Sequence, residues 1–177
     1  MSKLLNVSSS PHVRCGVSTK NLMYDVAIAM LPATIWGVMQ FGIYSLIVVV
    51  ATVLSCVLSE YLFETLMHKP VTISDGSALV TGMILGLNMP PAIPLWMPIL
   101  GGVFAIIVVK QLYGGLGQNW MNPALAARCF MLISFAQAMT KFTDPVTDAV
   151  ASATPLAAIK AGDTYDLAAM FIGKIPG

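Results

Sequence analysis

Charged residues are scarce in this sequence, and two long stretches contain none. They make up only 10% of the 177 residues, whereas 57% are hydrophobic; a soluble domain typically carries about 25% charged residues. No charge occurs between Asp25 and Glu60, or between Asp75 and Lys110. Each interval has room for two crossings of a hydrocarbon core that requires about 20 residues per helix. The composition therefore excludes an ordinary soluble domain and predicts an all-α polytopic membrane protein.

Cysteine is also scarce, and no long basic run is present. Cys15, Cys56 and Cys129 are scattered without a C-x-x-C pair, so this chain alone cannot supply the four thiolates of an iron–sulfur cluster. The net charge of +1, without interleaved basic and aromatic residues, argues against nucleic acid as a partner. The glycines at 114–117 do not complete G-x-G-x-x-G, which excludes a Rossmann site. We predict no metal site and no catalytic residue in this chain alone.

Apolar segments are expected to cross the membrane about five times. They lie at residues 23–39, 43–66, 76–87, 95–109 and 123–138. The polar arm of residues 1–21 carries three basic residues beside the first segment, which predicts a cytoplasmic N-terminus. A transmembrane domain of residues 22–138 then brings the chain out near Met139. Residues 139–166 are predicted to form an extracytoplasmic loop, and residues 167–177 to begin a further apolar segment.

The third apolar segment, residues 76–87, is too short to cross the membrane unaided. It follows Asp75, which is expected to cap it, and it ends in Asn88-Met89-Pro90-Pro91. Short apolar segments interrupted by glycine and proline are typical of discontinuous helices that line a transporter cavity. A short span packed tightly through small residues has the same pattern. Both interpretations remain open.

Two groups of polar residues at membrane depth are candidates for function. Asp75, Ser77, Thr81, Asn119 and Asn122 are expected to line a cavity or an ion path, and their alternative role is helix capping and hydrogen bonding between helices.

The second group is the pair Glu60 and Glu64, four residues apart on one face of the second segment. The favoured interpretation is an interfacial pair, solvated beside His68 and Lys69. The alternative is a mouth that attracts cations.

The stretch from Asp148 to Leu156 is small and polar in an otherwise apolar chain. Ser152 and Ala153 carry little side-chain bulk, so another molecule can approach the backbone closely. Pro155 biases the preceding Thr154 towards an extended conformation, which turns its hydroxyl outward as a nucleophile. On residue types alone, an ordinary loop with Asp148 as a turn former is the commoner meaning of such a stretch.

The same stretch resembles the flavin-attachment signature D-x-x-[ST]-[GS]-A-[ST], whose last hydroxyl a flavin transferase esterifies with FMN. In this alignment Asp148 is the leading acid, Ser152 and Ala153 are the small pair, and Thr154 is the acceptor. The sequence departs from the signature at Ala151, where serine or threonine is preferred.

With its motifs taken in order, most of the chain resembles the D subunit of the Rnf complex, a membrane machine that couples ferredoxin and NAD to ion pumping. The same family includes the B subunit of the sodium-pumping NADH:quinone oxidoreductase. The resemblance rests on Ser10-Pro11-His12, Asp75-Gly76-Ser77-Ala78, Val80-Thr81-Gly82, Lys110 with Tyr113 to Asn119, Asn122-Pro123-Ala124, and Asp148 to Leu156.

The resemblance implies an electron-carrying subunit of an ion-translocating oxidoreductase in a prokaryotic cytoplasmic membrane. It implies FMN esterified to Thr154 on the outer face, with Leu156 closing the attachment motif, and a second, non-covalent flavin within the membrane. The implied partners are other membrane and peripheral subunits, the flavin transferase and the lipid bilayer. Family members continue past the position of Gly177 with further helices, so the chain resembles the first half of an inverted-repeat bundle.

A competing hypothesis is a channel or transporter without redox chemistry, of the urea- or ammonium-channel-like type. The short third segment favours it, as does Asn122-Pro123-Ala124, which matches the aquaporin triplet. Aquaporins need that triplet twice, and it occurs once here.

Overall fold

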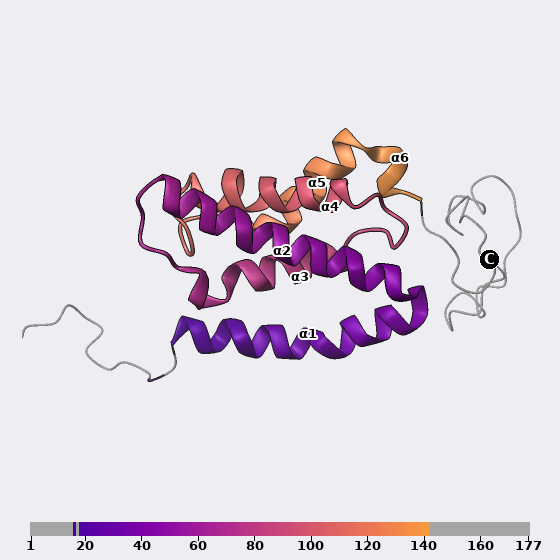
Figure 1. Ribbon diagram of the computed structural model, residues 1–177, viewed down its shortest axis with the longest axis horizontal. Coiled ribbons are helices and arrows are strands. Elements are labelled where there is room, and N and C mark those ends of the chain that lie inside the picture. Colours follow the sequence, from indigo (N-terminus) through magenta and orange to yellow (C-terminus); the bar gives the residue numbers. More distant parts are fainter. Residues whose placement is uncertain (1–15, 17, 142–177) are drawn as a thin grey trace, which may run out of the picture.

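The computed structural model describes residue 16 and residues 18–141, so the stretch around Thr154 lies outside the described residues. The described part is helical and contains no strand, which confirms the predicted all-α class (Figure 1). Its elements are α1 (Thr19–Phe41), α2 (Ile43–Leu66), η1 (Ile73–Asp75), α3 (Ser77–Leu87), α4 (Trp96–Val103), η2 (Phe104–Gln111), α5 (Pro123–Ser134) and α6 (Ala136–Met139).

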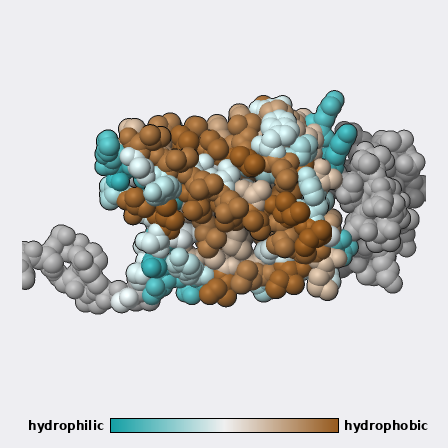
Figure 2. Space-filling model, viewed as in Figure 1, coloured by the Kyte–Doolittle hydropathy of each residue, from teal (hydrophilic) through white to brown (hydrophobic). Residues whose placement is uncertain are grey.

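The helices α1 and α2 form a hairpin that is long and apolar enough to cross a membrane twice. The side chain of Ser18 caps α1, and Gly42 joins the helices with a φ of 80°, which favours glycine. The second helix occupies the predicted residues, because an apolar run without a charge extends from Gly42 to Ser59 and the last turns, with Glu60 and Glu64, continue it. The surface supports a membrane location: Trp36 is 67% exposed, and apolar side chains cover the middle of the molecule between polar ends (Figure 2).

The short helix α3 packs against α2 through small residues. A Cβ added to Gly82 would lie 2.6 Å from the Cα of Val53, and one added to Gly86 would lie 2.9 Å from the Cα of Val49. The two backbones can approach this closely only because both positions are glycine. Tight packing through small residues, one of the two interpretations of this segment, therefore describes how α3 is held.

The fourth apolar segment changes from an α-helix to a π-helix along its length, which its apolar pattern did not predict. It begins as α4 and continues as η2, a π-helix, where the N–H of Leu112 donates to the carbonyl of Ile107, five residues earlier, at 3.0 Å. The hydroxyl of Ser55 on α2 donates to the carbonyl of Ile99 at 2.8 Å and holds the two elements together. The wider π turn reduces the angle between successive side chains, so that neighbours in sequence can share one face.

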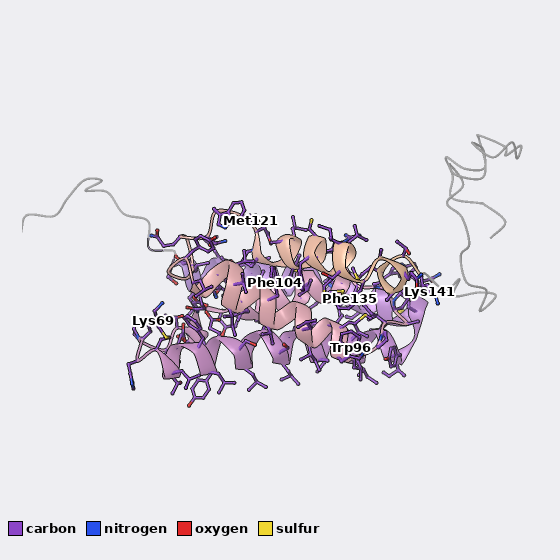
Figure 3. The ribbon with its side chains drawn as sticks, turned by 90° about the horizontal axis from the view of Figure 1, so that it is seen from above. Lys69, Trp96, Phe104, Met121, Phe135 and Lys141 are labelled. Atoms are coloured by element: carbon purple, nitrogen blue, oxygen red, sulfur yellow. The ribbon has the colours of Figure 1, made fainter. Side chains whose placement is uncertain are left out.

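The fifth apolar segment, predicted as one stretch over residues 123–138, is divided at Phe135, and the prediction is wrong at this point. There the backbone leaves the helical region, with φ −134° and ψ 48°, and separates α5 from α6. The ring of Phe135 packs edge-on against Trp96, with 5.3 Å between ring centroids (Figure 3). This contact between distant segments accompanies a break that the apolar run does not signal.

The two ends of the helix bundle can be told apart by their lysines. Lys69 and Lys141 lie at opposite ends (Figure 3), and α1 begins at the end that holds Lys69 (Figure 1). The described helices therefore begin and end at opposite ends of the bundle, while the number of membrane crossings stays a prediction. Which end faces the cytoplasm stays a prediction.

Candidate functional site: a buried polar cluster beside a cavity

The two glutamates of α2 are buried, and the prediction of a solvated interfacial pair is wrong. Glu60 is 0% exposed and Glu64 is 2% exposed. The helix η2 and the connection around η1 pack over this end of α2 and remove both carboxyl groups from solvent. Buried carboxyl groups require hydrogen-bond donors or a counter-charge.

Lys110 and Gln111, adjacent in η2, supply those contacts from the other side. The ammonium of Lys110 lies 2.6 Å from Glu60 Oε1 and forms a salt bridge that is buried on both sides. The side-chain amide of Gln111 donates to Oε1 of Glu60 at 2.9 Å and to Oε1 of Glu64 at 3.2 Å. Two consecutive residues thus both contact Glu60, as the π turn permits, and Gln111 also contacts Glu64.

The third side of the cluster is the start of α3. Lys110 also donates to the hydroxyl of Ser77 at 2.6 Å. The carboxylate of Asp75 accepts the backbone N–H of Ser77 at 2.7 Å, in the manner expected of a capping residue, and Gly76 between them has a left-handed φ of 78°. We call Glu60, Glu64, Asp75, Ser77, Lys110 and Gln111 the buried cluster.

Four of the five predicted cavity residues line one cavity of about 470 Å³. Its polar lining comes from two sides of the bundle: Ser77 and Thr81 on α3, and Asn119 and Asn122 before α5. Lys110 joins the same lining. Asp75, the fifth predicted residue, instead lines a smaller pocket of about 290 Å³ with Glu64, Thr72 and Gln111.

These side chains also perform local structural tasks. Thr81 donates its hydroxyl to the carbonyl of Ser77 at 2.8 Å. The side-chain oxygen of Asn122 accepts the backbone N–H groups of Ala124 and Leu125 at 3.0 and 3.3 Å, and so caps α5. Asn119 donates to the carbonyl of Met121 at 2.9 Å. The same side chains therefore line the cavity and also cap a helix or form hydrogen bonds to the backbone.

Sequence reasoning missed Lys110 and Gln111 as site residues. In the sequence Lys110 is only a basic residue at the end of an apolar segment, yet in the structure it is 2% exposed. A usable signal was present, because two acids on one face of an apolar helix need a partner and Lys110 ends another apolar helix.

Comparison with known proteins finds relatives of one family along nearly the whole chain. Residues 6–177 match the NQR2, RnfD, RnfE family. The chain is 49% identical over 161 residues to the D subunit of the Na(+)-translocating ferredoxin:NAD(+) oxidoreductase complex of Acetobacterium woodii, covering 90% of this chain and 51% of that protein. It is 42% identical over 160 residues to the D subunit of the proton-translocating ferredoxin:NAD(+) oxidoreductase complex of Clostridium ljungdahlii, covering 89% of this chain and 48% of that protein. The chain spans about half the length of these curated relatives.

Proposed function

The chain belongs to the NQR2, RnfD, RnfE family, and from this premise we propose that it acts as a membrane subunit of an ion-translocating electron-transport complex. In this role it carries electrons between the ferredoxin or NAD side and redox centres in the membrane, together with the other subunits of an Rnf-type complex. The observation that carries the proposal is the family match over residues 6–177, which includes both the buried cluster and the stretch around Thr154. The same match disfavours the channel without redox chemistry.

The electron carrier in this proposal is FMN esterified to Thr154 by a flavin transferase. Asp148, Ser152, Ala153 and Leu156 complete the attachment stretch, in which small residues leave room for the transferase and for the flavin phosphate. FMN accepts one or two electrons. Covalent attachment holds it in place, which a fixed relay requires more than it requires exchange of cofactor.

Replacing Thr154 by alanine is expected to abolish covalent flavin. The protein is expressed with an active flavin transferase, denatured and separated on a gel, and the flavin fluorescence of its band is measured. The matched control is Thr147→Ala, which removes the same hydroxyl immediately before Asp148 and should keep full fluorescence. A fluorescent Thr154→Ala band would remove Thr154 from this role. A dark wild-type band, with the transferase active on another target, would contradict the covalent flavin altogether.

A second, non-covalent flavin is assigned by the same proposal to the cavity of about 470 Å³. Its volume is within the range of roughly 300–1,000 Å³ that is typical of ligand sites. The lining suits a flavin ring, because Asn119 and Asn122 offer amide groups, Trp120 offers an aromatic face and Leu116 an apolar contact. Lys110 has three N–H donors, and the two contacts to Glu60 and Ser77 leave one for a ligand.

Narrowing this cavity is expected to release the second flavin. The measured quantity is the amount of flavin that acid precipitation releases from the complex. Thr81→Leu should weaken flavin binding by about tenfold or more, because overpacking costs about 1–3 kcal/mol and 1.4 kcal/mol corresponds to a tenfold change in affinity. Thr34→Leu is the matched control: both threonines are 9% exposed, and both donate to the carbonyl four residues earlier. Equal flavin in the two variants would contradict this site.

A further inference from the structure

The two buried glutamates differ in the hydrogen bonds that their carboxyl oxygens accept. Glu64 accepts from the backbone N–H of Thr72 at 3.0 Å, from the hydroxyl of Thr72 at 2.5 Å, and from Gln111. Both of its oxygens are therefore hydrogen-bonded. Glu60 accepts from Lys110 and Gln111 through Oε1 alone, and its Oε2 is buried without any hydrogen-bond partner among the described residues.

This asymmetry indicates which glutamate holds the negative charge. A carboxylate oxygen that is buried without a donor is far less favourable than a neutral carboxyl oxygen in the same place. The three donors around Glu64, two from Thr72 and one from Gln111, favour a carboxylate there. If both were ionised, the cluster would hold three negative charges, counting Asp75, against the single positive charge of Lys110.

A metal ion fits the bare oxygen of Glu60 less well than a proton does. Among residues 18–141, no group of three or more His, Cys, Asp and Glu side chains is placed to hold a metal ion. Hard cations such as Ca²⁺ and Mg²⁺ take six or more oxygen ligands, and the ammonium 2.6 Å from Oε1 would repel a second cation. A proton needs only one oxygen.

We propose that Glu60 binds one exchangeable proton at Oε2 while Glu64, one turn away, stays ionised. When the proton binds, one O–H bond of a hydronium ion breaks, a new O–H bond forms at Oε2 of Glu60, and a water molecule is released. A pocket of about 290 Å³ lies beside this pair, because Glu64 and Gln111 line it and Gln111 also contacts Glu60. The site gives the chain a proton-binding function that does not depend on any flavin.

The charged and titratable groups that face Glu60 come from three elements. From α2 they are Glu64 and Cys56, from η1 Asp75, and from η2 Lys110. Negative charge on Glu64 or Asp75 favours a proton on Glu60, and the ammonium of Lys110 opposes it. The titration is a property of this coupled set, and substitutions are needed to assign it to one residue.

The test is infrared difference spectroscopy of the complete protein in lipid nanodiscs during a pH titration. The wild type should show the carbonyl stretch of a buried, protonated carboxylic acid that disappears as pH rises and shifts in D₂O. Glu60→Gln should lose this band. Glu60→Asp should keep an acid band at a different frequency, and it decides the assignment if the glutamine variant does not fold. Glu64→Asp should keep the frequency of the band but change the pH at which it disappears, because Glu64 belongs to the coupled set. Asp25→Asn, which changes an exposed acid, should leave both the band and its pH dependence unchanged.

Each other outcome would overturn the proposal. The absence of an acid band in the wild type would mean that both glutamates stay ionised. A band that moves in Glu64→Asp and not in Glu60→Asp would place the proton on Glu64. Loss of the band when choline is replaced by Na⁺ at constant pH would show that a metal ion displaces the proton. None of these readouts involves flavin, so the result is independent of the tests of Thr154 and Thr81.

Discussion

Replacing Lys110 by methionine is expected to lower the free energy of unfolding by about 3–5 kcal/mol, the cost of removing one partner from a buried ion pair. Methionine fills a similar apolar volume, so the loss comes from the charge and its hydrogen bonds. Without the ammonium, the negative charge of the buried cluster has no counter-charge, whether or not Glu60 holds a proton, and Glu60 and Ser77 each lose a donor.

The measurement is thermal or denaturant unfolding of the protein in detergent micelles, and Lys69→Met is its matched control. Lys69 is exposed, with its ammonium 5.2 Å from the ring centroid of Phe63, and an exposed contact of this kind is worth about 0.5–1 kcal/mol. The difference between the two variants should shrink at low pH, because protonated carboxyl groups need no counter-charge. Equal stability of the two variants at neutral pH would contradict the buried ion pair.

Replacing Gly82 by valine is expected to separate α3 from α2 and to destabilise the protein by about 1–3 kcal/mol or more. The added Cβ would meet backbone, 2.6 Å from the Cα and 3.1 Å from the N of Val53, and backbone within a helix cannot move aside as a side chain can. The start of α3 carries Ser77, so the displacement should also disturb the contact to Lys110.

The matched control for this substitution is Gly37 in α1. A Cβ at Gly37 meets nothing within 4 Å, and alanine there should stabilise the helix by about 0.5–1 kcal/mol. Gly82→Ala tests the same contact with a smaller side chain and should destabilise, whereas Gly37→Ala should not. If both alanine variants were stabilising in an unfolding experiment, the close approach of α2 and α3 would be wrong.

Local signals were sufficient for several elements. The start of α2 follows from Gly42 and from the mostly apolar run that comes after it. The start of α5 follows from Asn122, which caps the helix, and from Pro123, which suits its first position. The predicted cavity residues were chosen for polarity at membrane depth, and four of them line one cavity. For the two helices the physical cause lies within a few residues of its effect, whereas the cavity residues come together only in the fold.

Other features had no local cause. The break at Phe135 occurs where that ring packs on Trp96, far earlier in the chain. The π-helix η2 interrupts a segment whose apolar composition suits an α-helix equally well. Glu60 and Glu64 have the same sequence pattern whether they are solvated at a helix end or paired inside the bundle, and Lys110 comes 50 residues after Glu60.

The sequence by itself determined that this is an all-α membrane protein of the NQR2, RnfD, RnfE family, because apolar runs of membrane length and a distinctive order of motifs need no folding to be visible. The tertiary structure alone decided that the acids of α2 are buried, that Lys110 and Gln111 contact them, and that one carboxyl oxygen has no hydrogen-bond partner within the described part of the chain. Burial and pairing depend on which distant segments meet, and in this protein two glycines facing α2 and one π turn control that meeting.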